Sequence, residues 1–403
     1  MLRKHKIASY YLYPNIGILL IIIFLITVSG CTPKNSPTEI LENNNYHPTQ
    51  IALLLPLESQ NKNTNVLANN LKNAARLAAH DLKHLNLILT IYPTSGEPAR
   101  AAYAAKAAVE NGSQIIVGPL LSEETLAVKI ALKKDLIKII SLSNDPSVAG
   151  NGVFIMGTSF QSVAKRLVTF SQSKGLKRIA IVSPKGPIGI NGIEAAKDAI
   201  IGNGSILSMI ATYPLNVSNI GELSPTIYED LINSNTDAII FTDSPTRGLG
   251  FITEQISALF KRNSKNMPQF MGLTRWDSAP SILDEPSLKR GWFVVPDQRF
   301  KKRYAARYFE TFGTNTIEIS SLAYDAIALI GGVRKLLDPK TEIKAFKQEH
   351  FTDRNGFIGV NGIFRFNQTG ESDRSLSVAE VIPGHFKIID DAKKQFMKNY
   401  NSQ

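Results

Sequence analysis

The segment Ile51-Ala52-Leu53-Leu54-Leu55 decides the fold class, because its five apolar residues follow one another without a polar one. A strand that turns one side to solvent alternates apolar and polar residues, whereas a strand buried on both faces does not. Apolar residues then recur at helical spacing between positions 66 and 82, and the next β-rich run is 85–92. This beginning predicts a parallel sheet with helices on both of its faces.

The alternation of strands and helices continues to the end of the chain in two series. The first series predicts helices at 97–111 and 122–134 and strands at 114–117 and 137–141. The second series predicts helices at 162–174, 189–201, 226–233 and 249–260 and strands at 178–182, 205–213, 238–242 and 269–272. The last part predicts a strand at 292–295, helices at 302–312 and 320–337, and β-rich segments at 362–366 and 376–382. We therefore expect an α/β protein with two lobes, in which a ligand binds at the carboxyl ends of the strands.

The N-terminal residues predict export from the cytoplasm. Basic residues at positions 3, 4 and 6 precede an apolar run, 16–28, which is too short for a comfortable membrane span and ends in small residues. These features predict a signal peptide at 1–30. The four residues Val28-Ser29-Gly30-Cys31 resemble the bacterial lipobox, in which the signal is cut before the cysteine and the cysteine receives lipid. The alternative is a plain anchor helix in which Cys31 is an unmodified thiol.

Composition argues against several other classes of protein. The net charge is +11, and 43% hydrophobic with 20% charged residues is an ordinary globular composition. The basic residues occur in short, separate groups such as Lys301-Lys302-Arg303, which indicates solvated helix faces rather than a nucleic-acid surface. Cys31 is the only cysteine, so no disulfide is expected. Residues 31–48 are almost free of apolar side chains and predict a flexible tether.

Two loops at neighbouring strand ends carry candidate binding groups. Gly118-Pro119-Leu120-Leu121-Ser122 joins a strand to a helix; we expect Ser122 to be the N-cap, next to backbone N–H groups that suit an anion. Glu123 and Glu124 follow directly, and their charge would oppose that anion. The second loop contains Ser143-Asn144-Asp145 and is either a binding loop or an ordinary Asx turn.

The sequence offers little for catalysis. It contains no Gly-x-Ser-x-Gly elbow, no phosphate-binding Gly-rich loop ending in Gly-Lys-Ser/Thr and no His-Glu-x-x-His. Ser162-Val163-Ala164-Lys165 has the Ser-x-x-Lys spacing of penicillin-recognising enzymes but lacks their partner motifs. His80 and His84 are four residues apart without further ligands nearby. We therefore expect that the protein is not an enzyme and that it binds neither a cofactor nor a metal.

Several of these segments resemble the type I periplasmic binding proteins, the family of the branched-chain amino-acid receptors. The resemblance rests on residues 51–57, on Ile115-Ile116-Val117-Gly118-Pro119-Leu120 and on Ser321-Leu322-Ala323-Tyr324-Asp325, and it covers roughly 50–390. It implies two Rossmann-like lobes with parallel sheets joined by three crossovers. The implied division is lobe 1 at 49–157 and 273–355, lobe 2 at 158–272 and 356–390, and a C-terminal tail at 391–403.

The resemblance also implies a set of ligand-binding residues. In the amino-acid receptors the first lobe holds the ligand's carboxylate and amine, and the matching positions here are Ser122, Ser143, Asn144 and Asp145. The second lobe departs from the family, since Ile188-Gly189 stands where a Tyr-Gly is expected. Asp243 and Arg247 occupy the region where the family has an acidic residue that pairs with the ligand's amine. The alternative for Arg247 is that it merely points to solvent.

Two functions follow from the resemblance. The first is a lipid-anchored solute-binding protein at the periplasmic face of the cell envelope, which captures a small amino-acid-like ligand for an ABC importer. The second rests on residues 143–154, which resemble a lipoprotein subgroup of Gram-negative bacteria that activates penicillin-binding proteins. In that case the chain is an outer-membrane lipoprotein that contacts a peptidoglycan synthase, with a vestigial cleft. Thr32, directly after Cys31, resembles an outer-membrane sorting signal.

Overall fold

The computed structural model describes residues 46–396. The chain divides into two units, Met1–Asn43 and Asn44–Gln403, and every described helix and strand belongs to the second unit. The predicted signal peptide, the predicted lipidation site Cys31 and most of the predicted tether lie outside the described residues. None of the described helices is both long enough and apolar enough to cross a membrane.

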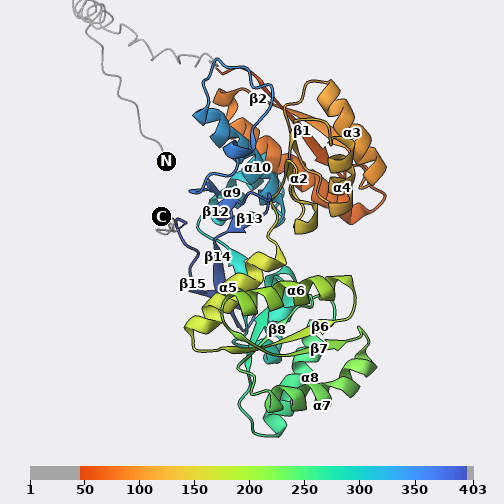
Figure 1. Cartoon of the computed structure of the whole chain (residues 1–403), viewed down its shortest axis with the longest axis vertical. Helices are drawn as coiled ribbons and strands as arrows, with labels where there is room; N and C mark the ends of the chain where they lie inside the picture. Colours follow the sequence, from red (N-terminus) through yellow and green to blue (C-terminus); the bar gives the residue numbers. More distant parts are fainter. Residues whose placement is uncertain (1–45, 397–403) are drawn as a thin grey trace, which may run out of the picture. The chain divides into compact units, whose positions relative to one another are not determined.

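The first lobe is built on a five-stranded parallel sheet with the order β2-β1-β3-β4-β5. Its strands are β1 (Thr49–Leu55), β2 (Leu87–Pro93), β3 (Ile115–Val117), β4 (Lys138–Ser141) and β5 (Val153–Ile155). The helices against it are α2 (Lys62–Asp81), α3 (Pro98–Glu110), α4 (Ser122–Ala131) and α10 (Ser320–Leu336) (Figure 1).

The side chains of β1 point alternately to the two faces of this sheet. Ile51, Leu53 and Leu55 belong to a core that they share with α2 and α10. Ala52 and Leu54 belong to a separate core with α3 and α4. Because both faces are covered, the strand has no polar side, and the prediction from its apolar run is confirmed.

The second lobe is built on a seven-stranded sheet with the order β15-β14-β10-β9-β8-β6-β7. Its strands are β6 (Arg178–Pro184), β7 (Ile206–Tyr213), β8 (Ala238–Phe241), β9 (Gln269–Gly272), β10 (Trp292–Pro296), β14 (Leu376–Ile382) and β15 (His385–Asp390). The helices of this lobe are α5 (Phe160–Ser173), α6 (Pro187–Gly202), α7 (Val217–Asn233) and α8 (Leu249–Arg262). Strands β6 to β10 are parallel to one another, and β14 and β15 add an antiparallel edge.

Helix α7 begins nine residues earlier than predicted, at Val217 instead of 226. Asn216 caps it by accepting a hydrogen bond from the backbone N–H of Asn219 (3.3 Å), and Pro225 lies inside the helix. Proline is enriched at the first position of a helix and unfavourable inside one, because it cannot donate the helical hydrogen bond. This explains why the sequence pattern placed the start of the helix after Pro225.

The chain passes between the two sheets three times, which confirms the predicted crossovers. The crossings lie between β5 and α5, between β10 and α9 (Lys301–Phe312), and between β13 and β14. Strand β13 belongs to a small antiparallel sheet of β11 (Phe357–Gly359), β12 (Gly362–Phe366) and β13 (Ser372–Arg374). Short 3-10 helices complete the fold at Lys83–Leu85, Pro146–Val148, Trp276–Ser278, Pro280–Asp284, Pro286–Leu288 and Gln348–His350.

Two of the expected lobe boundaries precede the observed crossings. The change expected after residue 272 comes before β10, which pairs with β9, and the buried Trp276 packs on Phe293 in the core of the seven-stranded sheet. The change expected after 355 comes before the small sheet, whose Phe366 packs on Phe154 in the core of the first lobe. Strand pairing and aromatic packing therefore move both boundaries toward the C-terminus.

Both ends of the described chain pack against the body. The ring of Tyr46, in the predicted tether, lies 4.9 Å from the guanidinium of the buried Arg334. In the predicted C-terminal tail, the backbone N–H of Ala392 donates to Oγ of Ser377 (2.9 Å). The folded body therefore starts slightly before, and ends slightly after, the limits predicted from composition.

A buried arginine joins the first and third crossings. Arg374 donates from Nε and Nη2 to the carbonyl oxygen of Met156 (3.1 and 3.0 Å). Its Nη1 lies 3.6 Å from Oδ2 of Asp325, and its guanidinium lies 4.6 Å from the centre of the Phe364 ring. Both charged side chains are at most 1% exposed. A charge that has lost its water needs such partners, so the pair is costly to break from one side.

We expect Arg374→Met to lower the free energy of unfolding by about 3 kcal/mol or more, because it leaves the carboxylate of Asp325 buried without a cation. Urea denaturation measures this. Lys347→Met is the matched control, since Lys347 belongs to an exposed pair with Glu349, and it should change stability by less than about 0.5 kcal/mol. An Arg374→Met protein as stable as the control would contradict the structural role of the pair.

Candidate ligand-binding site

The two candidate loops of the first lobe are hydrogen-bonded to each other at the carboxyl ends of β3 and β4. Oγ1 of Thr125 and Oγ of Ser141 are 2.8 Å apart, and the Ser141 hydroxyl also donates to the carbonyl oxygen of Pro119 (3.2 Å). The backbone N–H of Ser143 donates to Oγ of Ser141 (3.2 Å). Ser141, fully buried, therefore fixes the position of both loops, as their neighbouring strand ends predicted.

The loop 143–145 is an Asx-type turn that keeps some polar atoms unoccupied. The backbone N–H of Asp145 donates to Oγ of Ser143 (3.1 Å), and Oδ1 of Asp145 accepts from the backbone N–H of Ser147 (2.9 Å). Asn144 is exposed. Among the described residues no hydrogen-bond partner occurs for Oδ2 of Asp145 or for the amide of Asn144. The turn therefore organises the loop and leaves a carboxylate oxygen and an amide for a ligand.

Gly157, on the first crossing, packs directly against this turn. Its backbone N–H donates to the carbonyl oxygen of Ser143 (2.9 Å). A Cβ at this position would lie 2.5 Å from the same oxygen and 2.7 Å from Cα of Asn144. Only glycine leaves room for this approach, so the turn and the crossing form one packed unit.

Ser122 is the first residue of α4 and not its N-cap. Leu121 occupies the N-cap position and makes no side-chain capping bond. The prediction that Ser122 caps the helix is therefore wrong. Its partly buried side chain lies at the first turn, where the backbone N–H groups have no acceptor within the helix. An anion site at this helix end remains an expectation from the sequence.

Glu124, which the sequence places at the same helix end, is directed into the interior of the lobe. It is 0% exposed, and one of its carboxylate oxygens accepts a hydrogen bond from the hydroxyl of Thr94. The other oxygen has no partner among the described residues. Burial raises the pKa of Glu124 above its usual range, and the Thr94 hydrogen bond opposes this only in part. Glu124 is therefore a residue of the lobe interior rather than an exposed charge beside the helix end.

In the second lobe, the carboxylate of Asp243 is occupied within its own loop. Oδ1 accepts from the backbone N–H of Ser244 (2.8 Å) and from Nε of Arg247 (3.1 Å). Oδ2 accepts from the hydroxyl of Tyr213 (2.8 Å) and from the backbone N–H of Gly248 (3.0 Å). Burial and the neighbouring Asp243 both raise the pKa of Tyr213, so the tyrosine remains a neutral donor. The loop 243–248 is thus closed on itself around a fully buried carboxylate.

Arg247 is held by this carboxylate rather than directed freely to solvent. Its Nη2 lies 3.0 Å from Oδ1 of Asp243, and its side chain is 32% exposed. Gly189, from the expected Tyr-Gly position, is buried at the start of α6, where a Cβ would lie 1.8 Å from the carbonyl oxygen of Pro184. The described side chains of this region therefore pair Asp243 with Arg247 and leave no aromatic wall at Gly189.

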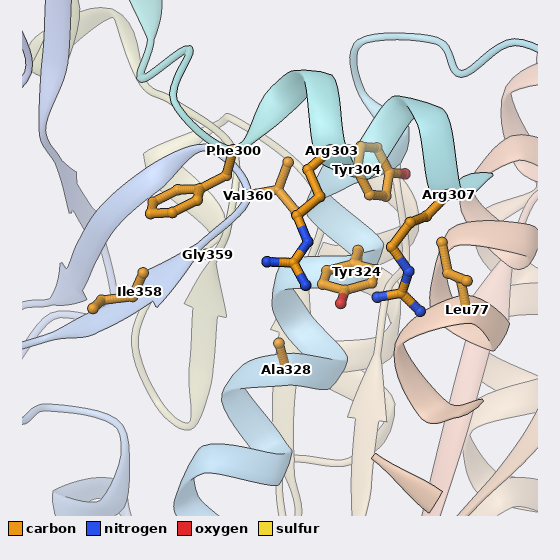
Figure 2. A pocket seen from close by; sticks show the side chains of 10 residues that line it. All are labelled: Leu77, Phe300, Arg303, Tyr304, Arg307, Tyr324, Ala328, Ile358, Gly359 and Val360. Atoms are coloured by element: carbon orange, nitrogen blue, oxygen red, sulfur yellow. The ribbon is translucent and has the colours of Figure 1, made fainter. Parts of the chain in front are cut away.

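Two cavities lie away from the six predicted binding residues. The first, of about 330 Å³, is in the first lobe and is lined by residues of α2, α9, α10 and β11 (Figure 2). The second, of about 540 Å³, is polar and lies between the start of α5 and the strands β12 and β13. Sequence reasoning missed both, and it interpreted Lys301-Lys302-Arg303 as a solvated helix face although Arg303 lines the first cavity.

The part of the chain from residue 46 to 396 contains no group of three or more His, Cys, Asp or Glu side chains that could hold a metal ion. The arrangement at the loops of the first lobe instead suits a small polar ligand. Its components are backbone N–H groups, hydroxyls, an amide and a carboxylate.

The comparisons with known proteins identify a family model and several relatives of this chain. A family model described as periplasmic binding protein matches residues 48–385. An uncharacterised protein of Rickettsia prowazekii is 22% identical over 237 residues, which cover 58% of this chain and 62% of that protein.

Two solved structures show the same fold. A protein from Rhodospirillum rubrum assigned to a branched-chain amino acid ABC transporter has a TM-score of 0.72 and 14% identity, covering 85% of this chain and 100% of its own. An ABC transporter substrate-binding protein from Desulfitobacterium hafniense, in complex with Leu, has a TM-score of 0.61 and 16% identity at the same coverage of both chains.

The environment of Glu124 predicts a pH dependence of stability. Because the pKa of Glu124 is raised in the folded state, that state binds more protons than the unfolded state between the two pKa values. Stability should therefore fall as pH rises through this window. Glu124→Gln removes the titration, so its stability relative to the parent protein should increase from pH 4 to pH 7.

Thermal unfolding at a series of pH values measures this difference. The control is Glu123→Gln in the same helical turn, because Glu123 is exposed. Parallel stability curves for Glu124→Gln and the parent protein would show that the carboxyl group does not titrate abnormally.

Proposed function

The chain belongs to the type I periplasmic binding protein family, and from this premise we propose that it captures a small amino-acid-like ligand and presents it to an ABC importer. Such a protein binds its ligand without a chemical step, so we expect neither catalysis nor a cofactor. Affinity arises when a ligand stabilises one arrangement of the two lobes, and the importer recognises that arrangement.

The observation that supports this function is the joined pair of loops after β3 and β4. We propose that Ser122, Ser143 and the first-turn N–H groups of α4 bind a carboxylate, because together they offer hydroxyl and backbone donors. Oδ2 of Asp145 is the proposed partner of an ammonium group. Asn144, exposed beside it, offers both a donor and an acceptor. These groups match the two ends of an amino acid.

The second lobe has a smaller proposed role. Asp243 already accepts four hydrogen bonds and is unsuited to a second, direct role with an ammonium group. Arg247 keeps guanidinium N–H groups beyond those facing Asp243, and we propose that they approach the ligand's carboxylate side.

The proposal includes attachment to a membrane. If residues 1–30 are removed and Cys31 receives lipid, the folded body is held at the periplasmic face of the envelope by the residues between Cys31 and Tyr46. The outer membrane is the proposed location if the host is Gram-negative.

A second function is favoured by the closed loop of Asp243. If the second lobe offers no free acidic group to a ligand, the fold could serve as a contact surface for a peptidoglycan synthase. We keep this regulatory function as the alternative, since the loops of the first lobe retain their free polar atoms.

A thermal-shift screen of the purified protein against amino acids, short peptides and cell-wall fragments tests ligand capture. A ligand at a hundred times its Kd should stabilise the native state by about 2.7 kcal/mol. Ser143→Ala and Asp145→Asn should each weaken the binding by roughly tenfold or more. Each removes a polar contact at the ligand, and Ser143→Ala also removes the acceptor of the Asp145 backbone N–H. Asn at 145 can still accept from the N–H of Ser147, which preserves the turn.

Ser147→Ala is the matched control, because its exposed hydroxyl lies in the same loop outside the proposed contacts. It should retain the full shift. Absence of a shift across the panel, together with capture of the protein by a purified peptidoglycan synthase, would replace the transport function by the regulatory one.

A further inference from the structure

The first cavity has the composition of a site for a small organic anion. Its volume of about 330 Å³ lies at the lower end of the range for small-molecule sites. Its lining contains two arginines and no acidic residue, and its other walls are apolar or aromatic. None of the six residues proposed to bind the transported ligand lines it, so it is a separate feature of the first lobe.

Arg303 is the uncompensated cation of this cavity. The described residues offer its side chain no hydrogen bond and no ion pair. Figure 2 shows the side chain reaching from α9 toward Tyr324, with Phe300 and Ile358 on one side of it and Arg307 on the other. The guanidinium is therefore presented to the cavity with its donors free.

Arg307 differs, because Asp81 neutralises it. Its guanidinium forms two hydrogen bonds with the two carboxylate oxygens of Asp81, and the hydroxyl of Tyr324 donates to the same carboxylate (2.7 Å). Arg307 and Tyr324 lower the pKa of Asp81 against the effect of its burial, so it stays ionised. Glu310 adds to the negative field at Arg307. One net positive group, that of Arg303, thus remains for a ligand.

The side chains that line the cavity favour an anion whose remaining part is apolar. The rings of Tyr304 and Tyr324 meet edge to face, with centroids 5.4 Å apart. Ile358 is 71% exposed and Phe300 is 42% exposed at this cavity, although both are large apolar side chains. Aromatic edges and faces of this kind pack well against a planar or branched apolar group.

The backbone of β11 forms a thin part of the wall. Gly359 lines the cavity, and a Cβ there would lie 2.4 Å from Cγ of the buried Asp325. The close packing of Asp325 against this position therefore requires glycine. Because glycine has no side chain, the backbone of β11 itself faces the cavity.

We propose that this cavity binds a carboxylate with an aromatic or branched apolar body, held by Arg303 through a charge-assisted, two-pronged hydrogen bond. Such a carboxylate is either a free small acid or the C-terminal residue of a peptide chain. The proposal is independent of the ligand bound at the loops after β3 and β4.

The test is a ¹⁹F-detected titration of the purified protein with 4-fluorophenylacetate. Binding should saturate, and the uncharged 4-fluorophenylacetamide should bind at least tenfold more weakly. Arg303→Gln should raise the Kd of the acid by about 10- to 100-fold, the loss expected for a hydrogen bond to a charged group. Ile358→Ser, at an exposed position, should raise it by a smaller factor through lost apolar contact.

Lys302→Gln is the matched control for net charge, because Lys302 is exposed on the same helix and does not line the cavity. It should leave the Kd unchanged. Competition by acetyl-Ala-Ala-Phe with a free carboxylate, but not by its amide, would identify a chain end as the preferred source. Competition by free aromatic acids alone would identify a small molecule.

Three results would overturn the proposal. The first is no saturable binding of the acid, and the second is equal binding by Arg303→Gln. The third is loss of binding in Ser143→Ala, which would place the probe at the loops of the first lobe. This last result would leave the transport function intact and remove only the second site.

Discussion

The burial of the Arg374 guanidinium is the constraint on which the rest of this structure depends. A cation without water must receive its hydrogen-bond acceptor, its counter-charge and its packing partners from the chain itself, and here they come from separate parts of it. Met156 on the first crossing supplies a carbonyl oxygen, α10 supplies the carboxylate of Asp325, and β12 supplies the ring of Phe364. Ser372 adds a hydrogen bond to the carbonyl oxygen of Gly157 (3.0 Å). These contacts therefore fix two of the three crossings to each other, independently of the strand pairing within either sheet.

The same contacts reach the proposed ligand site in two steps. Met156 receives the hydrogen bonds of Arg374, and its neighbour Gly157 donates to the carbonyl oxygen of Ser143. The turn that holds Asn144 and Asp145 is thus packed on the crossing and not only on its own strand. A displacement of the crossing would therefore also displace this turn, because closely packed protein interiors transmit strain. In a protein whose proposed function couples ligand binding to the arrangement of its lobes, these contacts connect the proposed site directly to a crossing.

The sequence was informative wherever structure depends on a local pattern. The apolar run 51–55 predicted a strand covered on both faces, and the two cores on either side of β1 confirm it. It was uninformative where a residue depends on a distant partner. Nothing in the sequence distinguishes Arg374 from other arginines, and the boundary near β10 depends on its pairing with β9. The saturation of Asp243 likewise depends on Tyr213, thirty residues away, so its position among expected ligand residues could not reveal that its oxygens are occupied.

The two lobes differ in how their strand-end loops use their polar groups, and this difference bears on selectivity. In the first lobe, Ser141 and the turn after it satisfy the backbone, while Oδ2 of Asp145 and the amide of Asn144 have no partner within residues 46–396. In the second lobe, every oxygen of Asp243 is used to hold its own loop. Groups that are already paired gain little from a ligand, because a new hydrogen bond must replace an existing one. We therefore expect the first lobe to recognise both charged ends of a ligand, and the second lobe to act mainly through its shape and through Arg247.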